Sequence, residues 1–121
     1  LELAGVEIPD DIQGISLMPL LRGEHPQDWR SSLYYHFYEY PAEHMVKRHY
    51  GVRTERYKLI HFYDDIDQWE LYDLQTDPTE MNNLFDKSGY ESIIEKLKQE
   101  LVGLQTLYGD SIEYRLRDKK L

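Results

Sequence analysis

The sequence predicts an α+β fold in which a four-stranded antiparallel sheet packs against a long C-terminal amphipathic helix. Between residues 33 and 74, four short segments rich in aromatic and β-branched residues alternate with polar turns, which is typical of an antiparallel meander. After residue 88, apolar residues recur at helical spacing. A chain of 121 residues is long enough to bury one modest core.

The N-terminal residues 1–28 are expected to be a connecting segment. Gly5, Pro9 and Gly14 interrupt them, so that they cannot form a core element alone. One short helical turn is predicted over residues 16–21, followed by a stop at Arg22-Gly23. The compact domain is then expected over residues 29–110, and a weakly ordered tail over residues 111–121.

The four strands are predicted at residues 33–40, 50–54, 57–63 and 69–74. Pro41 ends the first strand, because proline has no N–H group to donate to a neighbouring strand. A long polar loop follows before the second strand begins. The second and third strands form a hairpin with Glu55-Arg56 at its turn, and an acidic loop leads to the fourth strand.

The C-terminal helix is predicted to begin near Ser88, which precedes Glu91 in the order of a capping box. Its apolar stripe consists of Tyr90, Ile93, Ile94, Leu97, Leu101, Leu104 and Tyr108. Gly109 is expected to end the helix. Burial of these residues against the sheet, at about 1.5–3 kcal/mol each, would supply much of the stability of the domain.

Charge and composition exclude several functions. The net charge of −9 argues against general attraction to nucleic acid, and the absence of cysteine excludes disulfides and thiolate metal sites. No apolar run approaches the ~20 residues that span a bilayer, so no membrane partner is expected. One basic island stands out, with Lys47, Arg48, Arg53, Arg56 and Lys58 against a single Glu55.

The loop after the first strand contains the candidate binding residues. His44, Lys47, Arg48 and His49 place cationic or protonatable groups on an excursion from the sheet, which suits contact with a sulfate, phosphate or carboxylate. A solvated basic face is the other interpretation, and the residue types leave both open. His36 and His61 lie within aromatic strands, where hydrogen-bonded packing is the expected role.

The chain itself shows no catalytic or metal-binding residues. It has no G-x-S-x-G elbow and no glycine-rich phosphate loop, and its acidic run lacks the glycine of a calcium-binding loop. That run, from Asp64 to Glu80, is instead expected to pair with basic residues of the hairpin turn. We predict such pairing for Arg56 and leave the role of Arg53 open.

Three ordered blocks resemble the C-terminal subdomain of formylglycine-dependent sulfatases, which belong to the alkaline phosphatase superfamily. The blocks are LAGVEIPDDIQGISLMPLLRG (residues 3–23), GVRTERYKL (residues 51–59) and ELYDLQTDPTEMNNL (residues 70–84). The loop YPAEHMVKRH (residues 40–49) is similar, more narrowly, to that of N-acetylglucosamine-6-sulfatase-like members.

The resemblance implies a parent enzyme that hydrolyses sulfate esters of sulfated glycans such as N-acetylglucosamine-6-sulfate. It implies a formylglycine made within a Cys/Ser-x-Pro-x-Arg motif, and a calcium ion held by Asp and Asn residues. Neither that motif nor the Asp pair occurs here, so the isolated chain is predicted to be inactive. Its partners would be the parent catalytic domain and the sulfated sugar, in a periplasmic, secreted or lysosomal protein.

By position, His44, Lys47, Arg48 and His49 would then help to shape the substrate pocket, while the subdomain stabilises the catalytic domain. Two alternatives remain: an independent module that binds sulfated glycans through the basic island, or the same subdomain of a phosphodiesterase or phosphonate hydrolase. Without a catalytic domain, uncovered apolar residues such as Leu17 and Leu20 are expected to drive self-association.

Overall fold

The computed structural model describes residues 1–110, and the tail predicted at residues 111–121 lies outside the described residues. The chain divides into two compact units between Arg30 and Ser31. The first unit holds a 3-10 turn, η1 (Glu2–Ala4), and one helical turn, α1 (Met18–Leu21). The predicted turn over residues 16–21 is therefore confirmed.

The first unit has no core of its own. None of the residues in η1 or α1 is buried. Leu3 is 80% exposed and Leu17 60%, and exposed aliphatic side chains recur throughout this unit. The expected uncovered apolar surface is thus present in residues 1–30.

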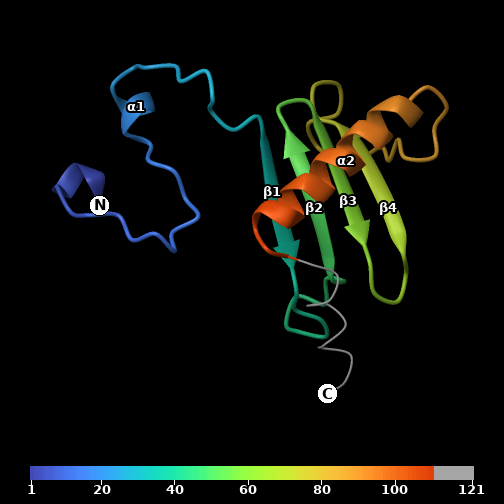
Figure 1. Ribbon diagram of the computed structural model, residues 1–121. Helices are drawn as coiled ribbons and strands as arrows, with labels where there is room; N and C mark the ends of the chain where they lie inside the picture. Colours follow the sequence, from blue (N-terminus) through green and yellow to red (C-terminus); the bar gives the residue numbers. More distant parts are fainter. Residues whose placement is uncertain (111–121) are drawn as a thin grey trace. The chain divides into compact units, whose positions relative to one another are not determined.

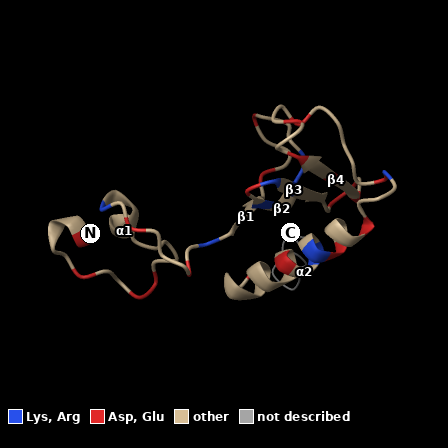
Figure 2. Ribbon diagram, turned by 90° about the horizontal axis from the view of Figure 1, so that it is seen from above, with Lys and Arg blue, Asp and Glu red and all other residues tan. Residues whose placement is uncertain are grey.

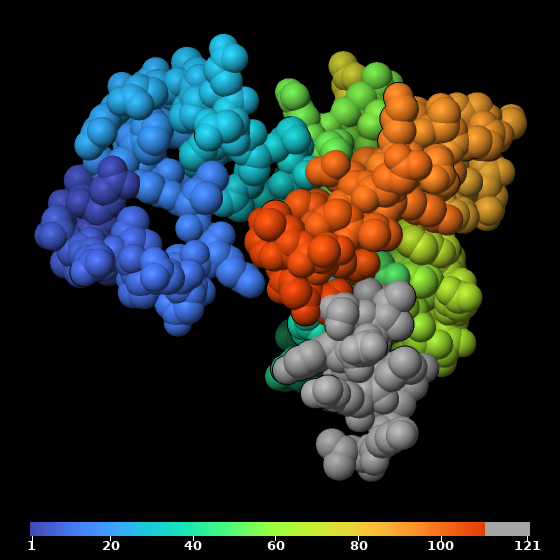
Figure 3. Space-filling view, viewed as in Figure 1, coloured from blue at the N-terminus to red at the C-terminus, as the bar shows by residue number. Residues whose placement is uncertain are grey.

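The second unit has the predicted α+β architecture. Its four antiparallel strands are β1 (Ser32–Phe37), β2 (His49–Thr54), β3 (Tyr57–Phe62) and β4 (Gln68–Asp73), which lie in the order β1-β2-β3-β4. Helix α2 (Glu91–Leu107) crosses one face of this sheet (Figures 1 and 2). In the space-filling view, α2 (orange) covers that face of the strands (Figure 3).

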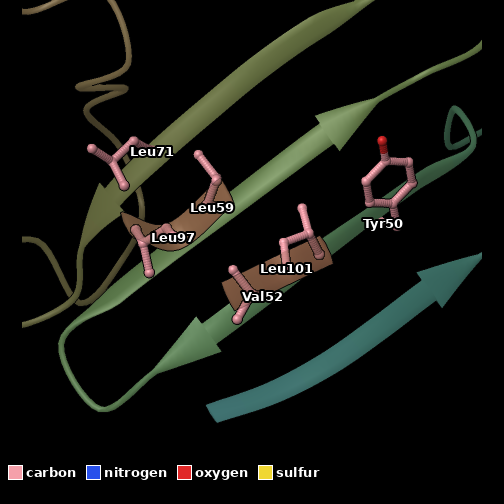
Figure 4. Close-up of a cluster of buried hydrophobic side chains, with 6 residues drawn as sticks. All are labelled: Tyr50, Val52, Leu59, Leu71, Leu97 and Leu101. Atoms are coloured by element: carbon pink, nitrogen blue, oxygen red, sulfur yellow. The ribbon is translucent and has the colours of Figure 1, made fainter. Parts of the chain in front are cut away.

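The register of the strands explains why this face is apolar. Val52 pairs with Leu59, and Leu59 pairs with Leu71, so all three side chains project from the same side of the sheet. Each is fully buried. Leu97 and Leu101 of α2 pack onto them, and Tyr50 completes the cluster (Figure 4). The helical stripe predicted from the sequence therefore meets the sheet as expected.

The N-terminal end of α2 differs from the prediction, and the C-terminal end agrees with it. Tyr90, rather than Ser88, occupies the N-cap position and makes no side-chain capping bond, so the predicted capping box is wrong. The Glu91 carboxylate instead accepts a hydrogen bond from the Gly89 N–H group at 2.9 Å. At the other end, Gly109 adopts a left-handed φ of 67°, which stops the helix as predicted.

The hairpin turn is fixed by a buried carboxylate. Arg56 donates from Nε and Nη2 to Asp73 at 2.8–3.2 Å, and the Gln75 N–H group donates to the same carboxylate at 3.2 Å. These bonds, the Arg56 guanidinium foremost, hold the pKa of Asp73 below its usual value. The predicted pairing of Arg56 with the acidic run is therefore confirmed, and the GVRTERYKL and ELYDL blocks are joined by it.

The segment after β4 folds back along that strand. Asn83 accepts a hydrogen bond from the Leu71 N–H group at 3.0 Å and donates to the Trp69 carbonyl at 3.2 Å. The Leu84 N–H group adds a bond to the Leu71 carbonyl at 2.8 Å. The DPTEMNNL motif thus has a structural role, because its last residues form hydrogen bonds with backbone groups on the outer side of β4.

Candidate functional site

The loop of residues 38–48 joins β1 to β2 and contains the predicted binding residues. We call it the 38–48 loop. It lies at the same end of the sheet as the loop that joins β3 to β4 (Figure 1). Its tip turns where the Met45 N–H group bonds to the Ala42 carbonyl at 3.0 Å, and Met45 takes a left-handed φ of 52°. Most residues of the tip are exposed.

Lys47 connects the 38–48 loop to the β3–β4 loop. Its Nζ donates to Asp65 at 2.5 Å and to the Tyr40 hydroxyl at 2.6 Å. The hydrogen bond to Asp65 raises the pKa of Lys47, and the same bond lowers the pKa of Asp65. Both groups are therefore charged throughout the neutral pH range.

Arg48 makes a second connection between the same two loops. Its Nη1 lies 3.3 Å from the Asp64 carboxylate. Its Nε donates to the Tyr38 carbonyl at 2.7 Å, which joins the last residue of the 38–48 loop to the first. The guanidinium therefore closes the base of the loop and ties it to its neighbour.

His49 begins β2 and lies on the sheet face opposite α2. Its ring packs between Phe37, at a centroid distance of 5.5 Å, and Phe62, at 5.0 Å. Nδ1 lies 2.8 Å from the Lys47 carbonyl. Because a carbonyl only accepts hydrogen bonds, Nδ1 carries the proton in this contact.

His44 differs from the other three predicted residues. It lies at the exposed tip, and no described residue makes a hydrogen bond or ion pair with it. The structure thus brings Lys47, Arg48 and His49 together at the base of the loop and presents the His44 imidazole to solvent.

The basic island is neutralised by carboxylates. Four of its five cations form ion pairs, which are Lys47–Asp65, Arg48–Asp64, Arg56–Asp73 and Lys58–Glu80. On α2 as well, acidic and basic positions are intermingled (Figure 2). The island therefore has little net positive charge with which to attract a polyanion over a distance.

A second polar cluster was not predicted. His36 Nδ1 lies 2.5 Å from Asp110, which directly follows the glycine that ends α2, and His36 Nε2 lies 2.9 Å from the Tyr63 hydroxyl. Tyr34 donates to the same Asp110 carboxylate. Burial, followed by this hydrogen bond, raises the pKa of Tyr34. The cluster fastens the end of α2 to β1.

His61 has a comparable structural role. Nδ1 lies 2.6 Å from the Tyr50 hydroxyl and Nε2 lies 2.8 Å from Asp67, while the ring stacks on Trp69 at 4.0 Å. The hydrogen-bonded packing predicted for His36 and His61 is therefore confirmed. The involvement of Asp110 was missed, because nothing in the local sequence distinguishes it from a solvated residue after a helix.

Within residues 1–110, no three His, Asp or Glu side chains lie close enough together to share a metal ion. The donor groups of this part of the chain therefore do not fit a calcium ion, which the sequence resemblance implies for the parent catalytic domain and not for this subdomain. No helix in the same residues has the length and apolar character needed to cross a membrane.

The comparison with known proteins agrees with the fold and the motifs. Residues 1–107 match the family described as N-sulphoglucosamine sulphohydrolase, C-terminal. The sheet-and-helix unit is thus a sulfatase C-terminal subdomain, and the chain belongs to this family.

Individual relatives are similar over most of this chain. An N-acetylglucosamine-6-O-sulfatase from Bacteroides thetaiotaomicron is 58% identical over 113 residues, which cover 92% of this chain and 20% of that protein. A solved sulfatase in complex with its substrate D-glucosamine-2-N,6-O-disulfate superposes with a TM-score of 0.87 at 56% identity, covering 92% of this chain and 23% of the other.

A more distant similarity extends beyond the sulfatases. The phosphonate monoester hydrolase of Agrobacterium radiobacter superposes with a TM-score of 0.63 at 25% identity, over 78% of this chain and 21% of the other. The chain thus spans about a fifth of the length of each of these three proteins.

Proposed function

We propose that this chain is the C-terminal part of a longer sulfatase that hydrolyses sulfate esters of sulfated glycans such as N-acetylglucosamine-6-sulfate. The observation that carries this proposal is the 58% identity, over 92% of the chain, to an N-acetylglucosamine-6-O-sulfatase. The identity to the phosphonate monoester hydrolase is 25%, which makes that chemistry the less supported alternative.

Within the longer protein, this subdomain stabilises the catalytic domain and shapes the substrate pocket through the 38–48 loop. Of the four predicted binding residues, His44 is the exposed one. Lys47 uses two of its three N–H groups in its bonds to Asp65 and Tyr40, which leaves one donor. Arg48 likewise retains N–H groups beyond the two in use. Such donors suit sulfate and hydroxyl oxygens.

The reaction itself depends on groups outside this chain. In the longer protein, residues of the catalytic domain would hold a formylglycine, which would supply a nucleophile, and a calcium ion, which would supply charge stabilisation. The residues described here contribute position and hydrogen bonds. The isolated chain is accordingly expected to have no sulfatase activity.

The other alternative, an independent module for sulfated glycans, depends on a positive surface. The ion pairs of Lys47, Arg48, Arg56 and Lys58 remove most of that positive charge. Salt-sensitive binding of heparan-type oligosaccharides to the isolated chain would nevertheless restore this alternative.

The experiment that tests the proposal begins with the coding sequence upstream of Leu1, searched for a Cys/Ser-x-Pro-x-Arg motif. The longer protein is then assayed for sulfate release from N-acetylglucosamine-6-sulfate, alongside a phosphonate monoester. We expect the motif and preferential sulfate release, with no turnover by the isolated chain. Phosphonate hydrolysis without sulfate release would contradict the proposal.

A further inference from the structure

We propose that Asp64 and Asp65 of the β3–β4 loop are positioning residues that hold the 38–48 loop, and with it His44, in place for substrate. This inference rests on the proposed function of the 38–48 loop. Both carboxylates belong to a different loop from the cations they contact, so the two loops are fastened to each other.

The contact made by Asp65 has two parts that reinforce each other. Lys47 Nζ lies between the Asp65 carboxylate at 2.5 Å and the Tyr40 hydroxyl at 2.6 Å, and it is 4.0 Å from the centre of the Tyr40 ring. The ammonium is therefore held from the 38–48 loop and from the β3–β4 loop at once. If the Asp65 carboxylate is removed, the Lys47 ammonium contacts only its own loop.

The contact made by Asp64 secures the base of the same loop. Arg48 bonds to the Tyr38 carbonyl at one end of the loop and to Asp64 on its neighbour. By contrast, the tip has one backbone bond within it, between Met45 and Ala42, among the bonds of the described residues. The position of the tip therefore depends on the attachment of the base.

The charges indicate what this arrangement contributes to recognition. Lys47 and Arg48 are matched by Asp65 and Asp64, so the pairs add no surplus positive charge to the pocket. The loop then acts by placing hydrogen-bonding groups, His44 foremost, against the sugar, rather than by long-range attraction to its sulfate. The effect of the aspartates should consequently appear in KM rather than in kcat.

The test uses Asp65→Asn in the full-length protein, with hydrogen–deuterium exchange of the Met45 amide, which bonds to the Ala42 carbonyl, as the first measurement. Faster exchange is expected, because the carboxylate no longer holds Lys47. The second measurement is turnover of N-acetylglucosamine-6-sulfate. An exposed ion pair of this kind sets an upper limit of about fivefold on the rise in KM, with kcat nearly unchanged.

Two further variants separate positioning from general destabilisation. Asp65→Glu keeps the carboxylate and should preserve most of the wild-type KM. Asp86→Asn removes an exposed carboxylate of the same unit that has no ion pair among the described residues, and it should leave exchange of the Met45 amide and KM unchanged.

Each result distinguishes between the inference and the function on which it rests. Unchanged exchange in Asp65→Asn overturns the inference. Faster exchange with an unchanged KM also overturns it, since the loop would then be held without consequence for substrate. His44→Ala tests the proposed role of the 38–48 loop in substrate binding. A raised KM supports a position of the loop at the substrate pocket, and an unchanged KM contradicts it.

Discussion

The two units of this chain differ in how their apolar residues are used. From Ser31 onward, strand register and helix spacing bring Val52, Leu59 and Leu71 under α2, where they are fully buried. In residues 1–30, aliphatic side chains are more frequent, yet Leu3 and Leu17 remain mostly exposed. The difference teaches that the second unit buries a core of its own, whereas the aliphatic side chains of the first unit form an exposed surface.

The comparison of the two units predicts that Leu59→Ala has the largest effect on the free energy of unfolding. Because Leu59 is fully buried beneath α2, the variant should lose about 2–5 kcal/mol of unfolding free energy. Leu17→Ala, the matched control in the first unit, should change it by less than about 0.5 kcal/mol. Urea denaturation followed by circular dichroism measures both. Equal losses would contradict the difference between the units.

Asp73→Asn should have an intermediate effect that depends on pH. The depressed pKa of Asp73 means that its ion pair with Arg56 stabilises the fold above the unfolded-state pKa and that this stabilisation is lost as pH falls through the folded-state pKa. The stability difference between wild type and variant should therefore be full at neutral pH. Below about pH 4 it should shrink, in thermal melts across pH 2–7. A constant difference would show that the charge is not involved.

The exposed first unit should govern self-association of the isolated chain. Replacement of Leu17 and Leu21 by Ser removes apolar surface without touching the core, since both side chains are exposed. Light scattering at high concentration should show association of the wild-type chain and weaker association of the variant. A strictly monomeric wild type would mean that this surface does not drive assembly.

The smallest effect on stability is expected for Lys47→Ala. Its ion pair with Asp65 is partly exposed, and such pairs stabilise proteins by about 0–1 kcal/mol. Thermal melts should accordingly show a near-native midpoint. A large loss would place the 38–48 loop among the stabilising elements of the second unit, alongside the core.

The fold followed from the sequence because local and long-range signals agreed. The alternation of apolar residues in the strands and the apolar stripe of the helix, which ends at Tyr108, both indicated one shared buried face. The number of strands, their order and the helix were therefore predictable. The prediction from Ser88 was wrong, because a capping pattern reports only local chemistry; Tyr90 is the N-cap and the helix begins at Glu91. Ion pairing of Arg56 was predictable from the acidic excess nearby.

The site was less predictable, because it depends on contacts between distant segments. Lys47 and Arg48 read as available cations in the sequence, whereas Asp65 and Asp64 reach them across 18 and 16 residues. The bond between His36 and Asp110 spans 74 residues. Such pairs depend on which loops lie at the same end of the sheet, and residue types alone do not reveal that arrangement.

Asn83 has a consequence for solubility. Its side-chain amide bonds to the Leu71 N–H group and to the Trp69 carbonyl on the outer side of β4, so these two backbone groups are not available to an incoming strand. Unprotected edges are where β-proteins stack into aggregates. In a chain that also exposes aliphatic residues, this side-chain amide therefore protects part of one sheet edge against strand addition.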